Sequence, residues 1–456
     1  MHILVINGSP KGAYSITLQT VEYLRILYPL HTFNVLHAGQ KIRALEKDFS
    51  EAKEAIEQAD ALLFSYPVYT FLAPSQLHRF IALMKKHDVN VQGKFCTQLT
   101  TSKRFYDVTA HRYVQDNCAD MGMRYVRGLS ADMDDLTKEK GRKEARAFFE
   151  YFIWCKENGV SEPAAEVSAD YEKHLATVPA GSDEGKTGDI VIVTDCREED
   201  ASLRTMIDRF RAECKRKSRV VNLNDFSFAG GCLGCFKCAV SEKCVYKDGF
   251  DAFLRNEIQQ ADGTVYAFTV RDHSMGPLFK TYDDRQFCNG HRTVTMGKPV
   301  GYLVSGDYQR EMNLQTVIEG RAQVGGNPLC GVAVDGADVD GMVSDLAMRM
   351  DYCLDNSYVP PSNFLGIGGM KVFRDLIWLM QGMMKADHKF YKAHGQYDFP
   401  QKQWPTMLKM YLVGALLSSP KLMSKAGNAM NEGMIMPYKK VLDKAKKEVD
   451  TAKNTM

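Results

Sequence analysis

The chain carries the same pattern of short apolar segments twice, and this repetition restricts the folds open to it. Residues 2–6 and 189–193 are short apolar runs of the kind that form buried strands. Further along each half, Ile56-Glu-Gln-Ala-Asp60 and Ile258-Gln-Gln-Ala-Asp262 lead into another apolar run. Strand-like runs separated by helical stretches of about ten to fifteen residues are typical of βαβ units. We therefore predict an α/β fold with two doubly wound parallel sheets in tandem.

The repeat divides the chain into two copies and two further segments. The first copy spans residues 1–157 and the second copy spans 188–356. Between them, residues 158–187 are rich in Ala, Pro, Ser and acidic residues, which is the composition of a linker. After a Pro-Pro pair the pattern changes, so residues 357–456 are predicted to form a helical C-terminal extension. Its many methionines suit core packing, or alternatively a flexible apolar face for a partner.

The composition excludes several kinds of protein. With 58 basic and 56 acidic residues the net charge is +2, which gives no electrostatic footprint for nucleic acid or an anionic membrane. No apolar stretch approaches the roughly eighteen residues of a membrane span, and the N-terminal apolar run is too short for a signal peptide. Twelve cysteines without a secretion signal indicate reduced thiols or metal ligands. We therefore expect a cytoplasmic protein without a membrane span.

The two copies differ by one insertion. Ser15 aligns with Ser202 at an offset of 187 residues, whereas Gln58 aligns with Gln260 at an offset of 202. The second copy has therefore gained fifteen residues between its second and third strands.

Four cysteines lie in this insertion with the spacing Cys232-x2-Cys235-x2-Cys238-x5-Cys244. Zinc sites of four cysteines generally form from two separated Cys-x2-Cys pairs. A Cys-x2-Cys-x2-Cys run is instead typical of a [4Fe–4S] cluster. The third interpretation is a group of thiols without a metal. The spacing favours the cluster, and the other two interpretations stay open.

The segment after the first strand, Asn7-Gly-Ser-Pro-Lys-Gly-Ala-Tyr-Ser-Ile-Thr17, has the composition of a phosphate-binding loop. Gly, Ser and Thr between a strand and a helix offer N–H groups and hydroxyls to a phosphate, and the helix dipole favours the anion. Ser9, Ser15 and Thr17 are candidate hydroxyl donors, and Lys11 adds positive charge. An ordinary turn with a helix cap is the alternative. The loop is not a GxGxxG dinucleotide fingerprint.

Three loops of the first copy resemble those of the flavodoxin-like NAD(P)H-dependent FMN reductases. They are the loop from Asn7 to Thr17, Ser65-Tyr-Pro-Val-Tyr69 after the third strand, and Thr100-Thr-Ser102 after the fourth. In that family the first loop holds the FMN phosphate, the second packs beside the isoalloxazine ring, and the third completes the pocket. The resemblance therefore implies an FMN site made by Ser9, Lys11, Ser15, Ile16, Thr17, Pro67, Val68, Tyr69, Thr101 and Ser102.

The second copy departs from this pattern where FMN would bind. Its first loop, residues 194–202, contains four acidic residues and no glycine, and carboxylates repel a phosphate. Its third-strand loop, residues 268–273, lacks the Pro-x-Tyr element. We therefore expect the second copy to have lost flavin. Arg271, Asp272 and His273 of that loop either reach the flavin of the first copy or form a solvated polar loop.

The cysteine run also resembles that of the iron–sulfur flavoproteins, whose cluster passes electrons to and from FMN. On this resemblance Cys232, Cys235, Cys238 and Cys244 are cluster ligands. The two copies would form a fused pseudo-dimer, with FMN in the first copy facing a [4Fe–4S] cluster in the second. Electrons would pass between NAD(P)H, FMN, the cluster and a small-molecule or protein acceptor.

Two other functions remain open at this point. One is a cluster-free NAD(P)H:quinone or small-acceptor reductase, and the other is a non-catalytic flavin electron carrier that docks to a redox partner. A homo-oligomer is compatible with each of them. No catalytic side chain is predicted, because in a flavin enzyme the cofactor carries the chemistry.

Overall fold

A computed structural model of the chain describes residues 1–163, 171–181 and 185–418, together with 435–436, 438–439, 441–447 and 450–451. The chain divides into two compact parts, residues 1–393 and residues 394–456. Some of the predicted linker (164–170 and 182–184) and much of the predicted extension beyond 418 lie outside the described residues.

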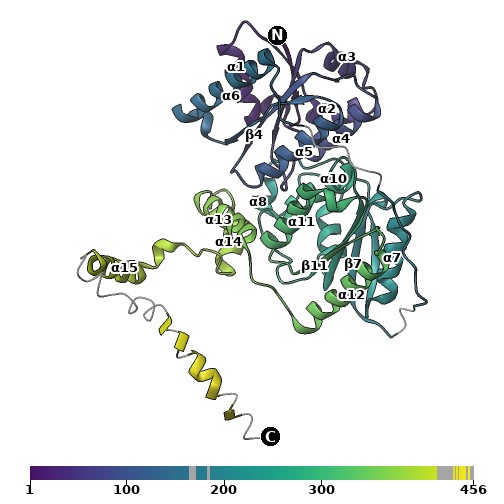
Figure 1. The fold of residues 1–456 in the computed structure, drawn as a ribbon, viewed down its shortest axis with the longest axis vertical. Coiled ribbons are helices and arrows are strands. Elements are labelled where there is room, and N and C mark those ends of the chain that lie inside the picture. The colour runs from purple at the N-terminus through teal and green to yellow at the C-terminus, as the bar shows by residue number, and fades with distance from the viewer. Residues whose placement is uncertain are drawn as a thin grey trace. The chain divides into compact units, whose positions relative to one another are not determined.

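The first copy is a parallel sheet with helices on both faces (Figure 1). Its strand order is β2-β1-β3-β4-β5, with a short β6 paired to β4. The strands are β1 His2–Asn7, β2 Thr32–Leu36, β3 Ala61–Pro67, β4 Phe95–Ser102, β5 Arg124–Tyr125 and β6 Leu129–Asp132. The helices are α1 Ile16–Leu27, α2 Ala38–Leu45, α3 Ser50–Gln58, α4 Ser75–Lys86, α5 Asp107–Asp120 and α6 Glu139–Asn158.

The second copy repeats this topology with the order β8-β7-β9-β10-β11, again all parallel. Its strands are β7 Thr187–Thr194, β8 Arg216–Asn222, β9 Gly263–Thr269, β10 Val300–Ser305 and β11 Leu329–Val334. Its helices are α7 Ala201–Glu213, α8 Lys237–Ser241, α9 Phe250–Phe253, α10 Gly276–Arg285, α11 Met312–Gly325 and α12 Val339–Asn356. The same position of each strand in both sheets confirms the prediction of a duplicated, doubly wound α/β fold.

The strands are apolar on both faces because helices cover both faces, as expected for a parallel sheet. In β1, Ile3 and Val5 pack with α1 and α6 in one core, whereas Leu4 and Ile6 belong to the core on the opposite face. This second core continues without a break into side chains of the second copy. The copies therefore share one hydrophobic core.

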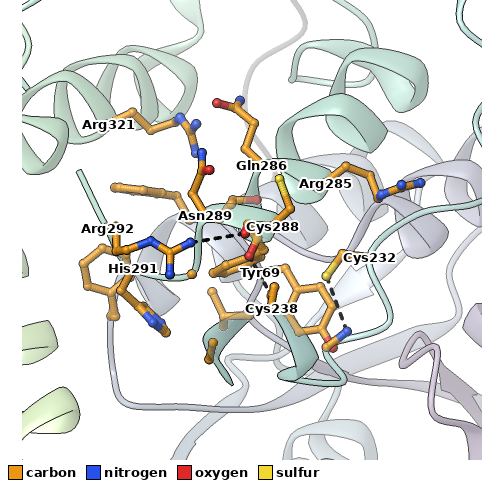
Figure 2. A pocket seen from close by; sticks show the side chains of 18 of the residues that line it. Tyr69, Cys232, Cys238, Arg285, Gln286, Cys288, Asn289, His291, Arg292 and Arg321 are labelled. Atoms are coloured by element: carbon orange, nitrogen blue, oxygen red, sulfur yellow. Dashed lines mark hydrogen bonds between the residues drawn. The ribbon is translucent and has the colours of Figure 1, made fainter. Parts of the chain in front are cut away.

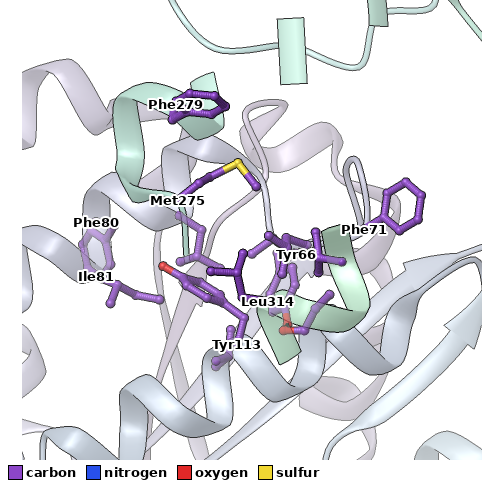
Figure 3. Close-up of a cluster of buried hydrophobic side chains, with 14 of the residues drawn as sticks. Tyr66, Phe71, Phe80, Ile81, Tyr113, Met275, Phe279 and Leu314 are labelled. Carbon is purple, nitrogen blue, oxygen red and sulfur yellow. Dashed lines mark hydrogen bonds between the residues drawn. The ribbon is translucent and has the colours of Figure 1, made fainter. Parts of the chain in front are cut away.

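Equivalent helices meet where the copies join. Helix α4 packs against α10, and α5 packs against α11, and these pairs occupy corresponding places in the two sheets. Such self-complementary pairing is the arrangement of a two-fold dimer. In Figure 3, Phe80 and Tyr113 of the first copy lie in one buried cluster with Met275, Phe279 and Leu314 of the second.

One ionic link across this junction has a pH dependence that can be tested. The ring nitrogens of His273 lie 3.0 Å from Asp120 Oδ2 on α5 and 3.0 Å from Glu311 Oε1 beside α11. Burial favours the neutral ring, but the hydrogen bonds and charges of the two carboxylates prevail and raise the pKa of His273 to about 10. Because the folded pKa lies above the ordinary 6.5, the stabilisation is complete below pH 6.5 and disappears as the pH rises through about 10.

Replacing His273 with glutamine should therefore cost on the order of 2 kcal/mol of unfolding free energy at pH 6, with allowance for solvent screening. The cost should shrink as the pH approaches 10.5. Urea unfolding of both proteins across this range measures it. A cost that stays constant with pH would contradict the assignment of a charged His273.

The C-terminal segment begins with two helices that belong to the first compact part, α13 Phe364–Leu379 and α14 Lys385–Ala393. Helix α13 packs on α11, and its Phe373 ring stacks on Phe105 of the first copy at 4.2 Å between centroids. In the second part, α15 spans Trp404–Leu417. Among the described helices, none is long and apolar enough to cross a bilayer.

Candidate functional site

All the residues predicted to hold cofactors line one cavity of about 380 Å³ between the two copies (Figure 2). The ten from the first copy are Ser9, Lys11, Ser15, Ile16, Thr17, Pro67, Val68, Tyr69, Thr101 and Ser102. The four from the second copy are Cys232, Cys235, Cys238 and Cys244. Cavities of about 300–1,000 Å³ are typical of cofactor and small-molecule sites.

The loop after β1 is held in shape by its own first residue. Asn7 Oδ1 accepts a hydrogen bond from the N–H of Ser9 (3.1 Å), and its Nδ2 donates to the carbonyl of Gly12 (2.9 Å). The loop ends at Ser15, the N-cap of α1, whose hydroxyl accepts from the N–H of Leu18. Because the first N–H groups of a helix have no partner within it, the residues after Ser15 offer donors to an anion. Ser15 is thus both a helix cap and part of the predicted phosphate-binding loop.

The carboxyl end of β4 lies beside the start of α1. The hydroxyls of Thr17 and Thr101 are 2.6 Å apart, and both side chains are buried. This bond joins two of the three loops identified from the sequence.

The third loop, after β3, is shaped by left-handed backbone and anchored by the second copy. Thr70 (φ 41°) and Phe71 (φ 71°) both adopt conformations that are uncommon for residues other than glycine. The ammonium group of Lys280, which is fully buried on α10, donates to the carbonyl of Tyr69 at 3.0 Å and to the Thr70 hydroxyl at 2.5 Å. Sequence reasoning missed Lys280, because a single lysine in a helical stretch carries no signal of a role 211 residues away.

The cysteine insertion lies directly against this loop. Gly234 is left-handed (φ +60°), and a side chain there would collide with the hydroxyl of Tyr69. The Gln76 Nε2 donates to the carbonyl of Cys232 at 3.2 Å, and Lys11 Nζ lies 5.6 Å from the centre of the Phe236 ring. The insertion of the second copy therefore closes over the predicted flavin loops of the first.

Burial favours the neutral form of three thiols in the cavity. Burial raises the pKa of Cys238 to about 11 and that of Cys288 to about 12, and it raises the pKa of Cys232 further. The Cys238 thiol donates to the carbonyl of Phe287 at 2.9 Å. Cys288 is a fifth cysteine on the cavity wall, and the spacing did not identify it because it lies outside the run.

The donor set has the right chemistry for a cluster, but the described residues are not arranged as ligands. Among them, no group of three or more His, Cys, Asp or Glu side chains converges on a position for a metal ion. Cys235 is exposed, whereas its three neighbours in the run are partly covered. The four thiols share a cavity without enclosing a common centre.

In the second copy, side chains of the protein occupy the position that corresponds to the predicted phosphate site of the first copy. Ser202, the counterpart of Ser15, donates its hydroxyl to the fully buried carboxylate of Asp335, as does Ser305 at 2.6 Å. The hydroxyl of Tyr171 donates to the same carboxylate at 3.0 Å, and Lys173 Nζ reaches Ser305 at 3.1 Å. A protein carboxylate thus takes the hydroxyls that a phosphate would need, which supports the expectation that this copy has lost flavin.

Residues 271–273 lie away from the cavity. Arg271 pairs with Asp200 in its own copy, Asp272 pairs with Lys85, and His273 pairs with Asp120 and Glu311. Of the two interpretations of this loop, contact with a flavin is the wrong one, because these side chains are committed to ion pairs outside the cavity wall.

Comparison with known proteins finds a family match in the first copy. Residues 1–150 match a family described by its flavodoxin-like fold, and no curated protein matches the chain. One similar solved structure is the apo form of an NADH:FMN oxidoreductase, EMOB (22% identity, TM-score 0.30, covering 36% of this chain and 91% of that one). Another is FerB of Paracoccus denitrificans, a flavoenzyme NAD(P)H:(acceptor) oxidoreductase (19% identity, TM-score 0.27, covering 34% of this chain and 97% of that one).

A third is an NAD(P)H:quinone oxidoreductase of Methanothermobacter marburgensis (14% identity, TM-score 0.27, covering 36% of this chain and 99% of that one). Each of these solved chains corresponds in length to about one copy of the duplication. The family match over residues 1–150, together with the observed strand order, identifies the first copy as a flavodoxin-like domain.

Proposed function

We propose that this protein is an FMN-dependent oxidoreductase that takes reducing equivalents from NAD(P)H and passes them to an acceptor. The observation that carries the proposal is the convergence of three loops on one cavity. The loop after β1, the Pro67–Tyr69 loop and the end of β4 are distant in sequence, and their predicted side chains all line the same space.

Each loop has a distinct task in binding FMN. Ser9, Ser15 and the first N–H groups of α1 would bind the phosphate, and Lys11 would balance its charge. Pro67 to Tyr69 and Thr101 to Ser102 would flank the ring. When bound, the flavin supplies both hydride and single-electron chemistry. The surrounding protein positions the ring and shields it from water with Phe71, Phe105 and Phe373.

The proposed [4Fe–4S] cluster at Cys232, Cys235, Cys238 and Cys244 is a separate part of the account. Its support is the spacing of the run and the shared cavity, and the lack of a converged ligand set among the described residues weighs against it. We therefore assign no electron-transfer step to the cluster. A cluster-free reductase with a quinone or other small acceptor fits the same geometry.

Anaerobic purification followed by flavin and iron analysis separates these versions. About four irons per chain and a band near 400 nm that dithionite bleaches would establish the cluster. Bound FMN without iron, together with NAD(P)H oxidation, would establish the cluster-free reductase. Bound FMN that NAD(P)H does not reduce would instead indicate an electron carrier for a protein partner.

The cysteines and the cavity also bear on the location of the protein and on its oligomeric state. The twelve cysteines are all free thiols, which fits a cytoplasmic location. A homo-oligomer is not required to complete the cavity, because both walls come from one chain.

A further inference from the structure

The cavity continues beyond the flavin loops and the cysteines into the second copy. Its far wall is made by the rings of Tyr266 on β9, Tyr282 on α10 and Tyr302 on β10, together with Arg321 on α11. Figure 2 shows Arg321 and Asn289 at one edge of the drawn residues, with Tyr69 nearer the centre. None of the three flavin loops supplies this wall, so a ligand here would be additional to FMN.

The charge of the lining is one-sided. In the described chain, no aspartate or glutamate lines the cavity, whereas six cationic side chains do. The six are Lys11, Lys103, Arg285, Arg292, Lys298 and Arg321. Cations without intervening carboxylates favour an anionic ligand, and the effect is strengthened inside a protein of low dielectric constant. A bound FMN phosphate would explain the positive charge at the end of the cavity with Lys11. It would not explain the positive charge at the opposite end.

Three of the cations at that opposite end have structural tasks. Arg285 binds Asp248 through both terminal nitrogens at 2.7 and 2.8 Å. Lys298 donates to the backbone carbonyls of Gln259 and Ala261. Arg292 pairs with the buried Asp387 at 3.4 Å, and only 6% of its side chain is accessible.

Arg321 is different, because 21% of its side chain is accessible and it lines the cavity. In the described chain its one ion pair is with Asp283 at 2.9 Å. A guanidinium has five N–H donors, so donors remain for a ligand. The guanidinium of Arg321 also stays protonated. Burial lowers its pKa, but the negative charge of Asp283 is one of the interactions that together outweigh burial and raise the pKa.

The amide of Asn289 lies on the same cavity and can contribute a polar contact to a ligand. Asn289 is only 7% exposed and lines the cavity, yet its side-chain amide has no hydrogen-bond partner among the described residues. Neither amide atom is among the fully covered side-chain atoms that lack a partner, so the amide can be reached from the cavity. A ligand with a carboxylate or carbonyl oxygen would satisfy it.

We propose that this end of the cavity binds a small aromatic anion, one or two rings bearing a carboxylate or sulfonate. Arg321 pairs with the anionic group, the Asn289 amide donates to an oxygen, and the ligand rings lie against the wall formed by Tyr266 and Tyr302, which pack on each other with centroids 5.4 Å apart. The guanidinium is 5.7 Å from the centre of the Phe71 ring, so the ligand lies beside the Pro67–Tyr69 loop. Its role as the electron acceptor rests on the proposed function, whereas its binding does not.

Calorimetric titration of the full chain with 2-naphthoate and with its neutral analogue 2-naphthamide tests the binding without redox chemistry. We expect naphthoate to bind about tenfold or more tightly, since a hydrogen bond to a charged group contributes about 1.5–3 kcal/mol. Arg321→Met should remove this preference, and Asn289→Ala should weaken naphthoate binding. Arg79→Met is the matched control, because Arg79 is equally accessible (21%) and pairs with Glu46 outside the cavity.

Equal affinity for the two probes in the unaltered protein, which requires no variant to fold, would overturn the proposal. So would naphthoate binding that is unchanged in Arg321→Met, or displacement of naphthoate by NADPH but not by 1,2-naphthoquinone-4-sulfonate. The FMN titration is a separate readout. A protein that prefers naphthoate but does not bind FMN would refute the proposed function and leave this site standing.

Discussion

Replacing Ser15 with aspartate is expected to abolish FMN binding while leaving the fold intact. Aspartate is as good an N-cap as serine, so α1 should keep its first turn. Its carboxylate would face the FMN phosphate, and two like charges about 4 Å apart repel by about 4 kcal/mol at an effective dielectric constant of 20. That energy corresponds to roughly a thousandfold loss of affinity, measurable by quenching of flavin fluorescence.

The matched control is Ser15→Asn, which also caps a helix but adds no charge. It should bind FMN within about tenfold of the unaltered protein. Circular dichroism checks the fold of both variants. If the aspartate variant bound FMN as tightly as the asparagine variant, the phosphate would not lie at this loop.

Replacing Lys280 with methionine is expected to destabilise the protein by about 3–5 kcal/mol, because it leaves the buried Asp284 carboxylate without its cation, whereas Asp283 keeps Arg321. Lys280 Nζ lies 3.3 Å from Asp283 and also pairs with Asp284, and all three side chains are buried. The Asp284 carboxylate also accepts the N–H of Ser75 at the start of α4 and the hydroxyl of Thr70. One lysine therefore supports both the joint between the copies and the loop beside the proposed flavin.

Chemical denaturation measures the loss. Lys53→Met serves as the control, because Lys53 is 37% accessible and its removal should change the unfolding free energy by less than about 1 kcal/mol. Adding Asp284→Asn to Lys280→Met should recover part of the loss, since the uncompensated charge is removed. A loss below about 1 kcal/mol for Lys280→Met would show that the buried ion network does not join the copies.

The parts of the site that follow strands were predictable from sequence. Asn7, Pro67 and Ser102 stand at the carboxyl ends of three parallel strands, and such ends meet at one edge of a sheet. The offset of fifteen residues placed the cysteines in the second copy, where the structure has them between β8 and β9. Periodicity and loop composition depend only on neighbouring residues, so both can be recognised in one sequence without a structure.

The contacts between the copies were not predictable in the same way. Lys280 and Asp335 contact residues far away in the chain, and nothing in the sequence around them marks these contacts. The contact of residues 271–273 with a flavin was the wrong interpretation for the same reason, because their partners on α4 and α5 are set by how the sheets pack. The spacing of the cysteines shows that four thiols are near one another in sequence, but it does not determine whether their sulfur atoms meet at one metal position.

We propose that the chain has one flavin site, which lies in the first copy on a cavity that the second copy completes. Calorimetric titration of flavin-free full-length protein with FMN tests it most directly. We predict one FMN per chain, because Asp335 and Tyr171 occupy the corresponding place in the second copy. Two FMN per chain, or none, would contradict the account.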